Sequence, residues 1–546
     1  MISSSGQPDP THATSLSRRA VLRAAVGAGA LGALATAPFA RPGIAGAQAS
    51  QETAIVIGTG FGGAVAALRL GEAGIRTTVF ERGRHWPIRP DGNTFATLLQ
   101  PDGRAAWFSD TVGATATVGI PVNRYPGILD RVKGNGIDSV YGAGVGGGSL
   151  AFGSFTPVPR KQDFEQVFPG GAGYDELVAT YYPRAKGMLG ASPLPADIMA
   201  HPRYIGTRSW QETVRRYGRE LVSFDYAIDW DIVRAELEGR APASIINGEL
   251  GFGVNSGAKN SVDRNYLPAA ERTGNVTINA MHEVFEIRPR DRRPGFVVSA
   301  RVIDDQHNTV RIVTAEADHL FMAAGSFHTT RMLVEARAKG TLPNLSPRIG
   351  EGFGANGDFL TARTALSDDY GDVQGGPGFG RLYEDDLPGG PASIVYHSTP
   401  LPSPLGKLAT TNLIQVHSDE RGTVDFDHAT GSAVINYPFP EGNDLDRRGA
   451  AFAEHFRQRA EVRHGRLASG IPIYSRAVGF GSASTYHGLG GVVMNRAATM
   501  DGAVLGYDNL YVVDGSFAPG AVGLVNPSLT IAALAERTMA RFVAGR

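Results

Sequence analysis

The 546-residue sequence predicts an α/β protein, α+β overall, with a Rossmann-like doubly wound nucleotide-binding domain and a second domain. The second domain is expected to hold a mostly antiparallel β-sheet with covering helices. Three observations predict this fold. Residues 54–81 read as strand, glycine turn, helix and strand. Short strand-like runs alternate with loops between residues 363 and 470. The chain is also longer than one hydrophobic core usually is.

The first of these stretches carries the pattern G-x-G-x-x-G at Gly58, Gly60 and Gly63. In such a unit the first glycine permits a tight turn, the second lets the backbone approach a pyrophosphate, and the third lets the helix pack on the strand. The helix N-terminus favours phosphate through its free N–H groups and its dipole. Glu81, 21 residues after Gly60, is placed to accept hydrogen bonds from ribose hydroxyls. The unit predicts binding of FAD or NAD; the alternative is an α/β turn in which glycine serves packing alone.

Composition excludes several classes of protein. The chain has 71 glycines, no cysteine and a formal net charge of −1. The lack of cysteine excludes disulfides, thiolate metal sites and cysteine nucleophiles. The sequence has no basic cluster long enough to indicate a nucleic-acid partner. We also predict no metal site.

Residues 1–49 are typical of a bacterial twin-arginine (Tat) signal peptide. The sequence SRRAVL at residues 17–22 precedes an uncharged run of alanine and glycine from Ala24 to Ala40, and small-residue cleavage sites follow at residues 45–49. The run is too short and too weakly apolar to predict a permanent membrane span. We therefore expect Tat export and a secreted protein; the alternative is a disordered alanine-rich tail.

The middle of the chain predicts further elements of both domains. The glycine-rich loop at residues 140–155 contains tyrosine, valine and leucine, which favours close contact with a cofactor over a flexible linker. Helical periodicity predicts amphipathic helices at residues 175–189 and 207–221. Trp210, Tyr217, Phe224, Tyr226 and Trp230 are interpreted as core residues, with a pocket lining as the alternative.

Later segments return to the cofactor domain. Residues 319–323 read as a buried strand, and Ala324-Gly325-Ser326 opens a helix to Ala338. At the end of the chain, a strand at residues 510–513 leads through a turn to a helix at residues 527–543, with Asn526 at the N-cap and Pro527 at the first helical position. We assign residues 50–90, 260–350 and 500–546 to the cofactor domain and residues 91–259 and 351–499 to the substrate domain.

Six stretches in order resemble the glucose–methanol–choline (GMC) oxidoreductases, and most closely the bacterial cholesterol oxidases within that family. They are GTGFGGAVAALRLGEAG, VGGGSL, LPNL with GFGANG, YHGLGG, VVDGSFAPG and VNPSLTIAALAER. The resemblance covers most of residues 52–543 and implies FAD as the cofactor. It implies contacts with the pyrophosphate from Gly58, Gly60, Phe61, Gly62 and Gly63, with the adenosine ribose from Glu81, with the adenine side from Val284, with the ribityl and pyrophosphate region from Asp514 and Gly515, and with the flavin from Gly148, Phe152, Gly153 and Ser528.

The resemblance also implies the catalytic residues. His487, in the sequence YHGLGG, matches the active-site histidine, and Asn526 matches its partner asparagine. An imidazole can donate or accept a proton near neutral pH, and a carboxamide can orient the same substrate oxygen. His397 stands where cholesterol oxidases carry a glutamate base that isomerises the steroid product, so we do not expect the isomerase step. Phe152 replaces an asparagine, and Ser528 an aromatic residue, near the flavin.

The implied function is a secreted FAD-dependent alcohol oxidase, with 3β-hydroxysteroid (cholesterol) oxidation to the ketone and reduction of O2 to H2O2 as the leading hypothesis. One alternative is another lipophilic or secondary alcohol, with a quinone or dye as electron acceptor. A second is a flavoprotein or sterol-binding protein without catalysis, and a third is an NAD dehydrogenase. A sterol substrate implies transient contact with a membrane surface, with candidate lid residues at 100–130. The oligomeric state stays open.

Overall fold

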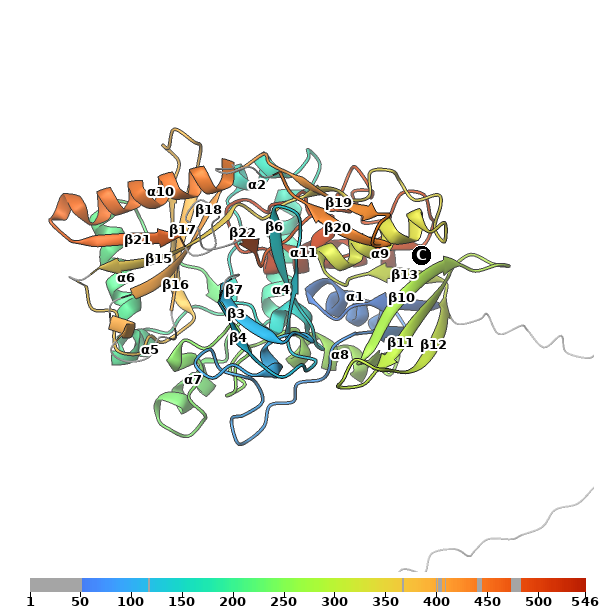
Figure 1. Cartoon of the computed structure of the whole chain (residues 1–546), viewed down its shortest axis with the longest axis horizontal. Coiled ribbons are helices and arrows are strands. Elements are labelled where there is room, and N and C mark those ends of the chain that lie inside the picture. The colour runs from blue at the N-terminus through green and yellow to red at the C-terminus, as the bar shows by residue number, and fades with distance from the viewer. Residues whose placement is uncertain are drawn as a thin grey trace, which may run out of the picture. The chain divides into compact units, whose positions relative to one another are not determined.

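The computed structural model describes residues 52–115, 118–365, 368–398, 400, 405–407, 409–438, 444–472 and 483–546. The predicted signal peptide lies outside these residues. Gln51–Arg546 forms one compact unit (Figure 1), so the boundaries between the two predicted domains stay a prediction. In the described part of the chain, no helix combines the length and the apolar character that crossing a membrane requires.

A five-stranded parallel sheet carries the first predicted unit. Its order is β23 (Leu510–Val512), β13 (His319–Met322), β1 (Thr53–Ile57), β2 (Arg76–Phe80) and β9 (Val276–Asn279). Three segments far apart in the sequence therefore build one sheet. The connecting helix α1 (Phe61–Glu72) packs against α8 (Tyr266–Arg272) and α11 (Ser528–Ala544). The predicted strand–turn–helix–strand unit is confirmed.

The glycines of this unit permit close backbone contacts. Gly58 has φ +101°, in the region that favours glycine. A Cβ atom on Gly62 would lie 1.8 Å from the carbonyl oxygen of Val513, which follows β23. A Cβ atom on Gly63 would lie 2.1 Å from the carbonyl oxygen of Gly58. Glycine at these positions therefore lets α1 approach both the turn that precedes it and the edge of the sheet.

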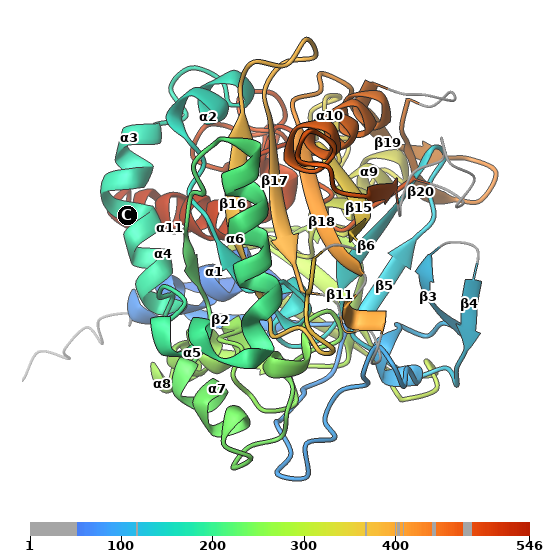
Figure 2. The ribbon, with the colours of Figure 1, turned by 90° about the vertical axis from the view of Figure 1, so that its left-hand side faces the viewer.

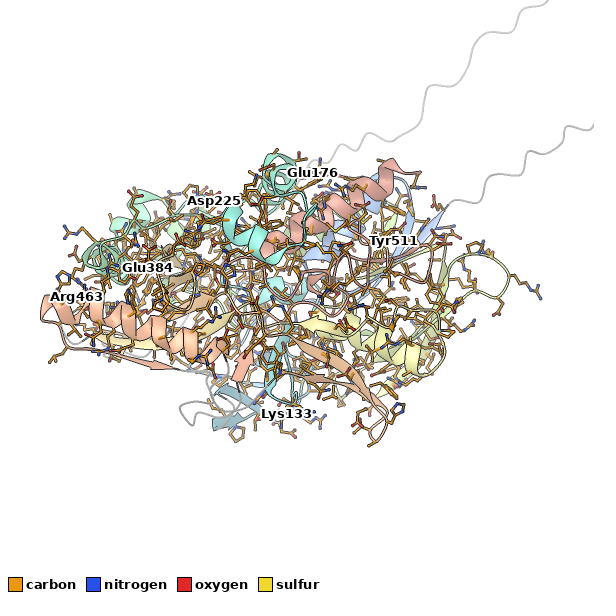
Figure 3. All side chains as sticks on the ribbon, turned by 90° about the horizontal axis from the view of Figure 1, so that it is seen from above. Lys133, Glu176, Asp225, Glu384, Arg463 and Tyr511 are labelled. Carbon is orange, nitrogen blue, oxygen red and sulfur yellow. The ribbon has the colours of Figure 1, made fainter. Side chains whose placement is uncertain are left out.

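A five-stranded antiparallel sheet forms the other large layer. Its order is β16 (Gly378–Glu384), β17 (Ala392–His397), β18 (Ala409–Val416), β15 (Asp358–Ala365) and β21 (Ala468–Pro472). The helices α6 (Ile205–Tyr217) and α10 (Asp444–Ala460) pack on it (Figure 2). In Figure 3, Glu384 on β16 and Tyr511 on β23 lie toward opposite ends of the view, as do the two sheets. This arrangement confirms the predicted fold class.

Smaller sheets and helices complete the described part. The sheets combine β10 (His282–Pro289), β11 (Phe296–Ile303) and β12 (Thr309–Ala317); β14 (Glu351–Phe353), β19 (Gly422–Asp427) and β20 (Ser432–Asn436); β22 (Ala483–Thr485), β6 (Ile137–Gly142) and β5 (Leu129–Val132); β3 (Thr111–Thr115) and β4 (Val118–Pro121); and β7 (Phe155–Thr156) and β8 (Asp225–Tyr226). The further helices are α2 (Lys161–Val167), α3 (Tyr174–Glu176), α4 (Tyr182–Met188), α5 (Ala196–Ala200), α7 (Trp230–Leu237) and α9 (Ser326–Ala338). The predicted helix at 175–189 consists of α3, a π-helical turn at Leu177–Tyr181, and α4.

The aromatic residues in and after α6 pack in the core. Trp210 stacks on Phe456 of α10 with ring centroids 5.6 Å apart, and Tyr217 stacks on the same ring at 5.2 Å. Tyr226 lies edge-on to Trp230, and both are buried. The interpretation of these four as core residues is confirmed.

The predicted N-cap of the last helix is wrong. Helix α11 begins at Ser528, and Pro527 occupies the N-cap position. The side chain of Asn526 does not cap the helix, because its Oδ1 accepts a hydrogen bond of 2.8 Å from the buried Nη2 of Arg381. A charged donor satisfies this carbonyl oxygen more strongly than a backbone N–H group does.

Candidate active site

One cavity of about 1050 Å³ joins the two large sheets. It begins at the carboxyl ends of β1, β2 and β13 and reaches His397 at the end of β17. Ligands of open α/β sheets bind at the carboxyl ends of the strands. The volume is at the upper limit of the ~300–1,000 Å³ usual for small-molecule sites. The cavity therefore has room for a dinucleotide together with a second molecule.

The structure brings the predicted site residues together, with one exception. The cavity lining contains Gly58, Gly60, Phe61, Gly62, Glu81, Gly148, Phe152, Gly153, Val284, His397, His487, Asp514, Gly515, Asn526 and Ser528. Gly63 lies outside the lining and packs α1 against β1, as its place in the motif predicts. The individual roles assigned to these residues stay predictions.

The phosphate-binding end of the cavity fits a dinucleotide. A Cβ atom on Gly60, the N-cap of α1, would meet no atom within 4 Å, so this part of the cradle is open. Within the described part of the chain, no side chain caps α1 and no acidic residue lies in its first turn. Its first N–H groups are therefore available to an anion.

Internal hydrogen bonds fix the orientation of the Glu81 carboxylate beside this cradle. Its Oε2 accepts hydrogen bonds from the Oγ1 and the backbone N–H of Thr59, at 2.7 and 3.1 Å, and its Oε1 accepts one of 2.8 Å from the N–H of Gly83. The carboxylate is 5% exposed and faces the cavity. A carboxylate held in this way can still accept bonds from a ribose, because its two oxygens offer about four acceptor sites.

Asp514 organises the opposite wall. Its carboxylate accepts hydrogen bonds from the backbone N–H and Oγ of Ser516 at 2.9 and 2.6 Å, and from the N–H of Gly325 at 2.8 Å. Burial raises the pKa of Asp514 above its usual value, and these hydrogen bonds oppose the shift. The residue thus ties the end of β23 to the start of α9, where both line the cavity.

Both predicted catalytic side chains line the cavity and are held by buried charged residues behind them. The Nδ1 of His487 lies 2.7 Å from Oδ2 of Asp358, the first residue of β15. Asn526 is held by Arg381, which is fully buried on β16. The sequence analysis missed both Asp358 and Arg381. Asp358 directly follows the glycine-rich stretch GFGANG, which was the available signal for it; Arg381 carries no comparable motif.

A buried lysine that the sequence analysis also missed supports the glycine-rich loop at 140–155. The Nζ of Lys259 donates hydrogen bonds of 2.8 Å to the carbonyl oxygens of Leu150 and Leu250 and lies 5.5 Å from the ring centroid of Phe152. Burial lowers the pKa of Lys259 to about 7. Phe152 in turn lies edge-on to Phe61 at 5.2 Å. Lys259 thereby holds the loop against the start of α1.

Four charged or titratable side chains line the cavity along with Val284, the residue predicted to lie on the adenine side. Asp130 accepts a hydrogen bond of 2.7 Å from Arg82 and lies 3.0 Å from Nε2 of His328. Burial lowers the pKa of His328 to about 3. Arg331, one turn from His328 along α9, completes the group. No motif in the sequence analysis pointed to these residues.

His397 sits in an apolar part of the wall. Its ring lies edge-on to Phe155 at 4.7 Å, and its Nε2 is buried without a hydrogen-bond partner among the described residues. Burial, together with the nearby Arg381 and His487, lowers the pKa of His397 to about 3. The ring is therefore uncharged at neutral pH and holds a proton weakly.

The lowered pKa of His397 makes the stability of the folded protein depend on pH. Between pH 6.5 and 3 the unfolded chain protonates His397 and the folded chain does not, so the free energy of unfolding falls as the pH falls through this window. At pH 5 the cost is about 2 kcal/mol, from ~1.5 pH units at ~1.36 kcal/mol each. We expect His397→Asn to reduce the loss of stability between pH 7 and pH 5 by this amount, measured by urea unfolding at both values. The exposed His428→Asn is the control; equal losses in parent and His397→Asn would contradict the lowered pKa.

The chain is similar to known oxidoreductases in part of its sequence. Residues 418–535, which contain His487 and Asn526, match the C-terminal family model described as GMC oxidoreductase. This segment is therefore similar to the C-terminal part of GMC oxidoreductases. The predicted resemblance to the GMC oxidoreductases is confirmed.

Similarity to curated proteins extends over most of the chain. A cholesterol oxidase of Acinetobacter baumannii is 25% identical over 89% of this chain and 93% of its own length. A cholesterol oxidase of Mycobacterium tuberculosis (strain ATCC 25618 / H37Rv) is 26% identical over 88% of this chain and 89% of its own length.

Two solved structures are similar to this chain in fold. Pyridoxine 4-oxidase from Mesorbium loti has a TM-score of 0.59 and 16% identity over 90% of this chain and 99% of its own. A fungal aryl-alcohol oxidase has a TM-score of 0.57 and 14% identity over 90% and 98% of the two chains. At such identities the structures support the fold alone.

Proposed function

We propose that the protein is an FAD-dependent oxidoreductase acting on CH–OH donors, and that its substrate is a 3β-hydroxysteroid such as cholesterol. One observation carries the proposal: a single cavity has a dinucleotide-binding motif at one end and His487 with Asn526 at the other. The cholesterol oxidase relatives, which this chain matches over most of their length, support the sterol.

The residues of this chain supply binding and proton handling. FAD, when bound, supplies the acceptor of the hydride from the alcohol carbon. The cradle at Gly60 and the carboxylate of Glu81 would hold its phosphates and ribose. His487 receives the hydroxyl proton, and Asn526 hydrogen-bonds the hydroxyl oxygen. The N-terminus of α11, at Ser528 in the cavity lining, stabilises negative charge that develops nearby.

The apolar part of the cavity lining fits a lipophilic substrate. Its apolar side chains include Phe155, Leu250, Phe252, Leu360 and Leu489. We do not propose an isomerase step, because His397 replaces the glutamate base and its pKa of about 3 makes it a weak base at neutral pH. The site therefore supports oxidation to the ketone without migration of a double bond.

We further propose Tat export and transient contact with a membrane surface. Leu98, Leu99 and Ile120 are 39, 54 and 46% exposed, and Leu98 also lines the cavity. Exposed apolar side chains beside a cavity mouth favour contact with an apolar surface. The twin-arginine sequence at residues 17–22 supports the export route.

A second candidate is oxidation of another lipophilic or secondary alcohol with an acceptor other than O2. His397, Phe152 and Ser528 all differ from the cholesterol oxidase pattern and all line the cavity. Three changes around one site alter its shape and polarity, which are the properties that select a substrate.

Anaerobic mixing of the purified holoprotein with a panel of alcohols tests the proposal. We expect cholesterol to bleach the visible flavin absorption band and its 3α-epimer, the matched control, to leave the band unchanged. Oxygen added afterwards should restore the band and release H2O2 in proportion. Bleaching by other alcohols but not by cholesterol would favour the second candidate. No bleaching by any alcohol would contradict the proposed oxidoreductase activity.

A further inference from the structure

A continuous chain of polar contacts joins the two predicted catalytic side chains: three hydrogen bonds, followed by a close approach of the His487 ring to a carboxylate. Arg381 donates from Nη2 to Oδ1 of Asn526 at 2.8 Å and from Nη1 to Oε1 of Gln415 at 2.6 Å. Gln415 donates from Nε2 to Oδ1 of Asp358 at 3.0 Å. The other oxygen of Asp358 lies 2.7 Å from Nδ1 of His487. The three connecting residues lie on β16, β18 and β15 of the antiparallel sheet; β17 separates β16 from β18, and Asp358 pairs directly with Gln415.

The guanidinium group sets the direction of every bond in this chain, because arginine has five donors and no acceptor. The atom of Gln415 that faces Arg381 must be its carbonyl oxygen, so its amide N–H group faces Asp358. The same N–H group lies 3.0 Å from the carbonyl oxygen of Val525, an acceptor, which agrees with this orientation. Oγ of Ser393 and the carbonyl oxygen of Leu524 also lie within hydrogen-bond distance of Nη1, at 2.6 and 2.8 Å, and share its two N–H groups with Gln415.

His487 and Asn526, at the two ends of this series of contacts, are oriented by the same rule of donors facing acceptors. A carboxylate at Asp358 only accepts, so the proton of a neutral His487 ring resides on Nδ1 and the lone pair resides on Nε2. Asn526 turns its carbonyl oxygen to Arg381, so its amide N–H2 group is the free end. Both residues line the cavity, and the polar contacts of their side chains with other described residues are made by Nδ1 of His487 and Oδ1 of Asn526, which leaves Nε2 and Nδ2 for a ligand.

We propose that Arg381 is a positioning residue that fixes the hydrogen-bond polarity of both catalytic side chains: an acceptor at His487 Nε2 and a donor at Asn526 Nδ2. One acceptor and one donor match a single hydroxyl group, which donates through its hydrogen and accepts through its oxygen. Gln415 and Asp358 transmit the polarity to His487. The inference rests on the proposed function, since the hydroxyl is that of the alcohol.

The isosteric substitution Asp358→Asn reverses the polarity at His487. Gln415 and Asn356 both donate toward Oδ1 of Asp358, at 3.0 and 3.3 Å. The new carboxamide must turn its oxygen to these donors and its N–H2 group to Nδ1 of His487, which moves the ring proton to Nε2. We expect the rate of flavin reduction by the alcohol to fall ~10²–10⁴-fold, with KM and flavin content little changed, because a histidine in the wrong tautomer cannot accept the proton.

Nitrogen-15 NMR of histidine-labelled holoprotein tests the tautomer without any substrate. We expect the parent His487 signals to show a protonated Nδ1 and a free Nε2, and Asp358→Asn to show the reverse; His487→Gln assigns the signals by their loss. The same tautomer in both proteins would overturn the inference. This readout is independent of alcohol oxidation, so an error in the proposed function would leave it unaffected.

Substitution of Arg381 tests whether this one residue sets the hydrogen-bond polarity of both His487 and Asn526. Arg381→Lys retains the charge, but one ammonium group cannot reproduce the fork that reaches Gln415 and Asn526 together. We expect at least a tenfold fall in the rate of flavin reduction and mixed tautomers of His487. The matched control is Arg363→Lys on β15, also buried but paired with Glu461 outside the cavity. If both variants lose stability alike and keep the parent tautomer and rate, Arg381 is structural only and the inference fails.

Discussion

Replacing His487 by alanine lowers the rate of alcohol oxidation by ~10²–10⁴-fold while FAD stays bound. This range is the usual contribution of a group that accepts a proton in the transition state. The cofactor is expected to stay because its phosphate cradle lies at the other end of the cavity, at Gly58–Gly60. Stopped-flow measurement of flavin reduction gives the rate, and the absorption ratio of flavin to protein gives the occupancy.

Asn526→Ala is also expected to lower the rate of alcohol oxidation, because the hydroxyl oxygen of the substrate then loses its amide donor. It also leaves Nη2 of the buried Arg381 without its partner, so the melting temperature is measured alongside the rate. The exposed His428→Ala, in the β19–β20 hairpin, is the control for loss of a histidine. Unchanged rates in both the His487 and Asn526 variants would refute their assignment to catalysis.

Gly62→Ala is expected to destabilise the folded protein by at least ~3 kcal/mol. A Cβ atom there would lie 1.8 Å from the carbonyl oxygen and 2.6 Å from the carbonyl carbon of Val513, both backbone atoms that cannot rotate away. Helix α1 must then move off the turn that carries Asp514, at a cost above that of ordinary overpacking. Thermal unfolding and the yield of soluble holoprotein measure the effect.

Gly60→Ala is the matched variant two residues earlier. Its Cβ atom would meet nothing within 4 Å, so the fold is expected to persist. The added methyl group would instead occupy the open cradle and weaken FAD binding. The pair thus separates the packing role of one glycine from the binding role of the other. A folded, flavin-replete Gly62→Ala protein would show that α1 has more freedom than these distances indicate.

The sequence predicts the local units of this fold well. Strand, turn and helix at residues 53–72 follow from apolar runs and glycine spacing, which depend on neighbours in the chain. His487 and Asn526 are found because each lies in a motif. The polar residues behind them are different: Arg381, Gln415 and Asp358 come from three strands, and their contact depends on strand register, which periodicity does not specify.

The one wrong prediction at the site has the same origin. Asn526 before Pro527 has the residue types of a helix start, and local rules place an N-cap there. A buried guanidinium from β16, 145 residues away in sequence, takes the side-chain oxygen instead. The low pKa of His397 is equally non-local, because it results from burial and from neighbours on other strands.

The parallel sheet fixes when during synthesis the cofactor site becomes complete. Its edge strand β23 and the helix α11, which packs on α1, belong to the last 37 residues, whereas β1 and α1 are made first. A ribosome must therefore translate β23 and α11 before the cradle acquires its second wall. Pairing over such a separation is slow, since a long loop must close first. Completion of the proposed FAD site therefore comes late in the synthesis and folding of each molecule, after β23 has joined the sheet and α11 has packed on α1.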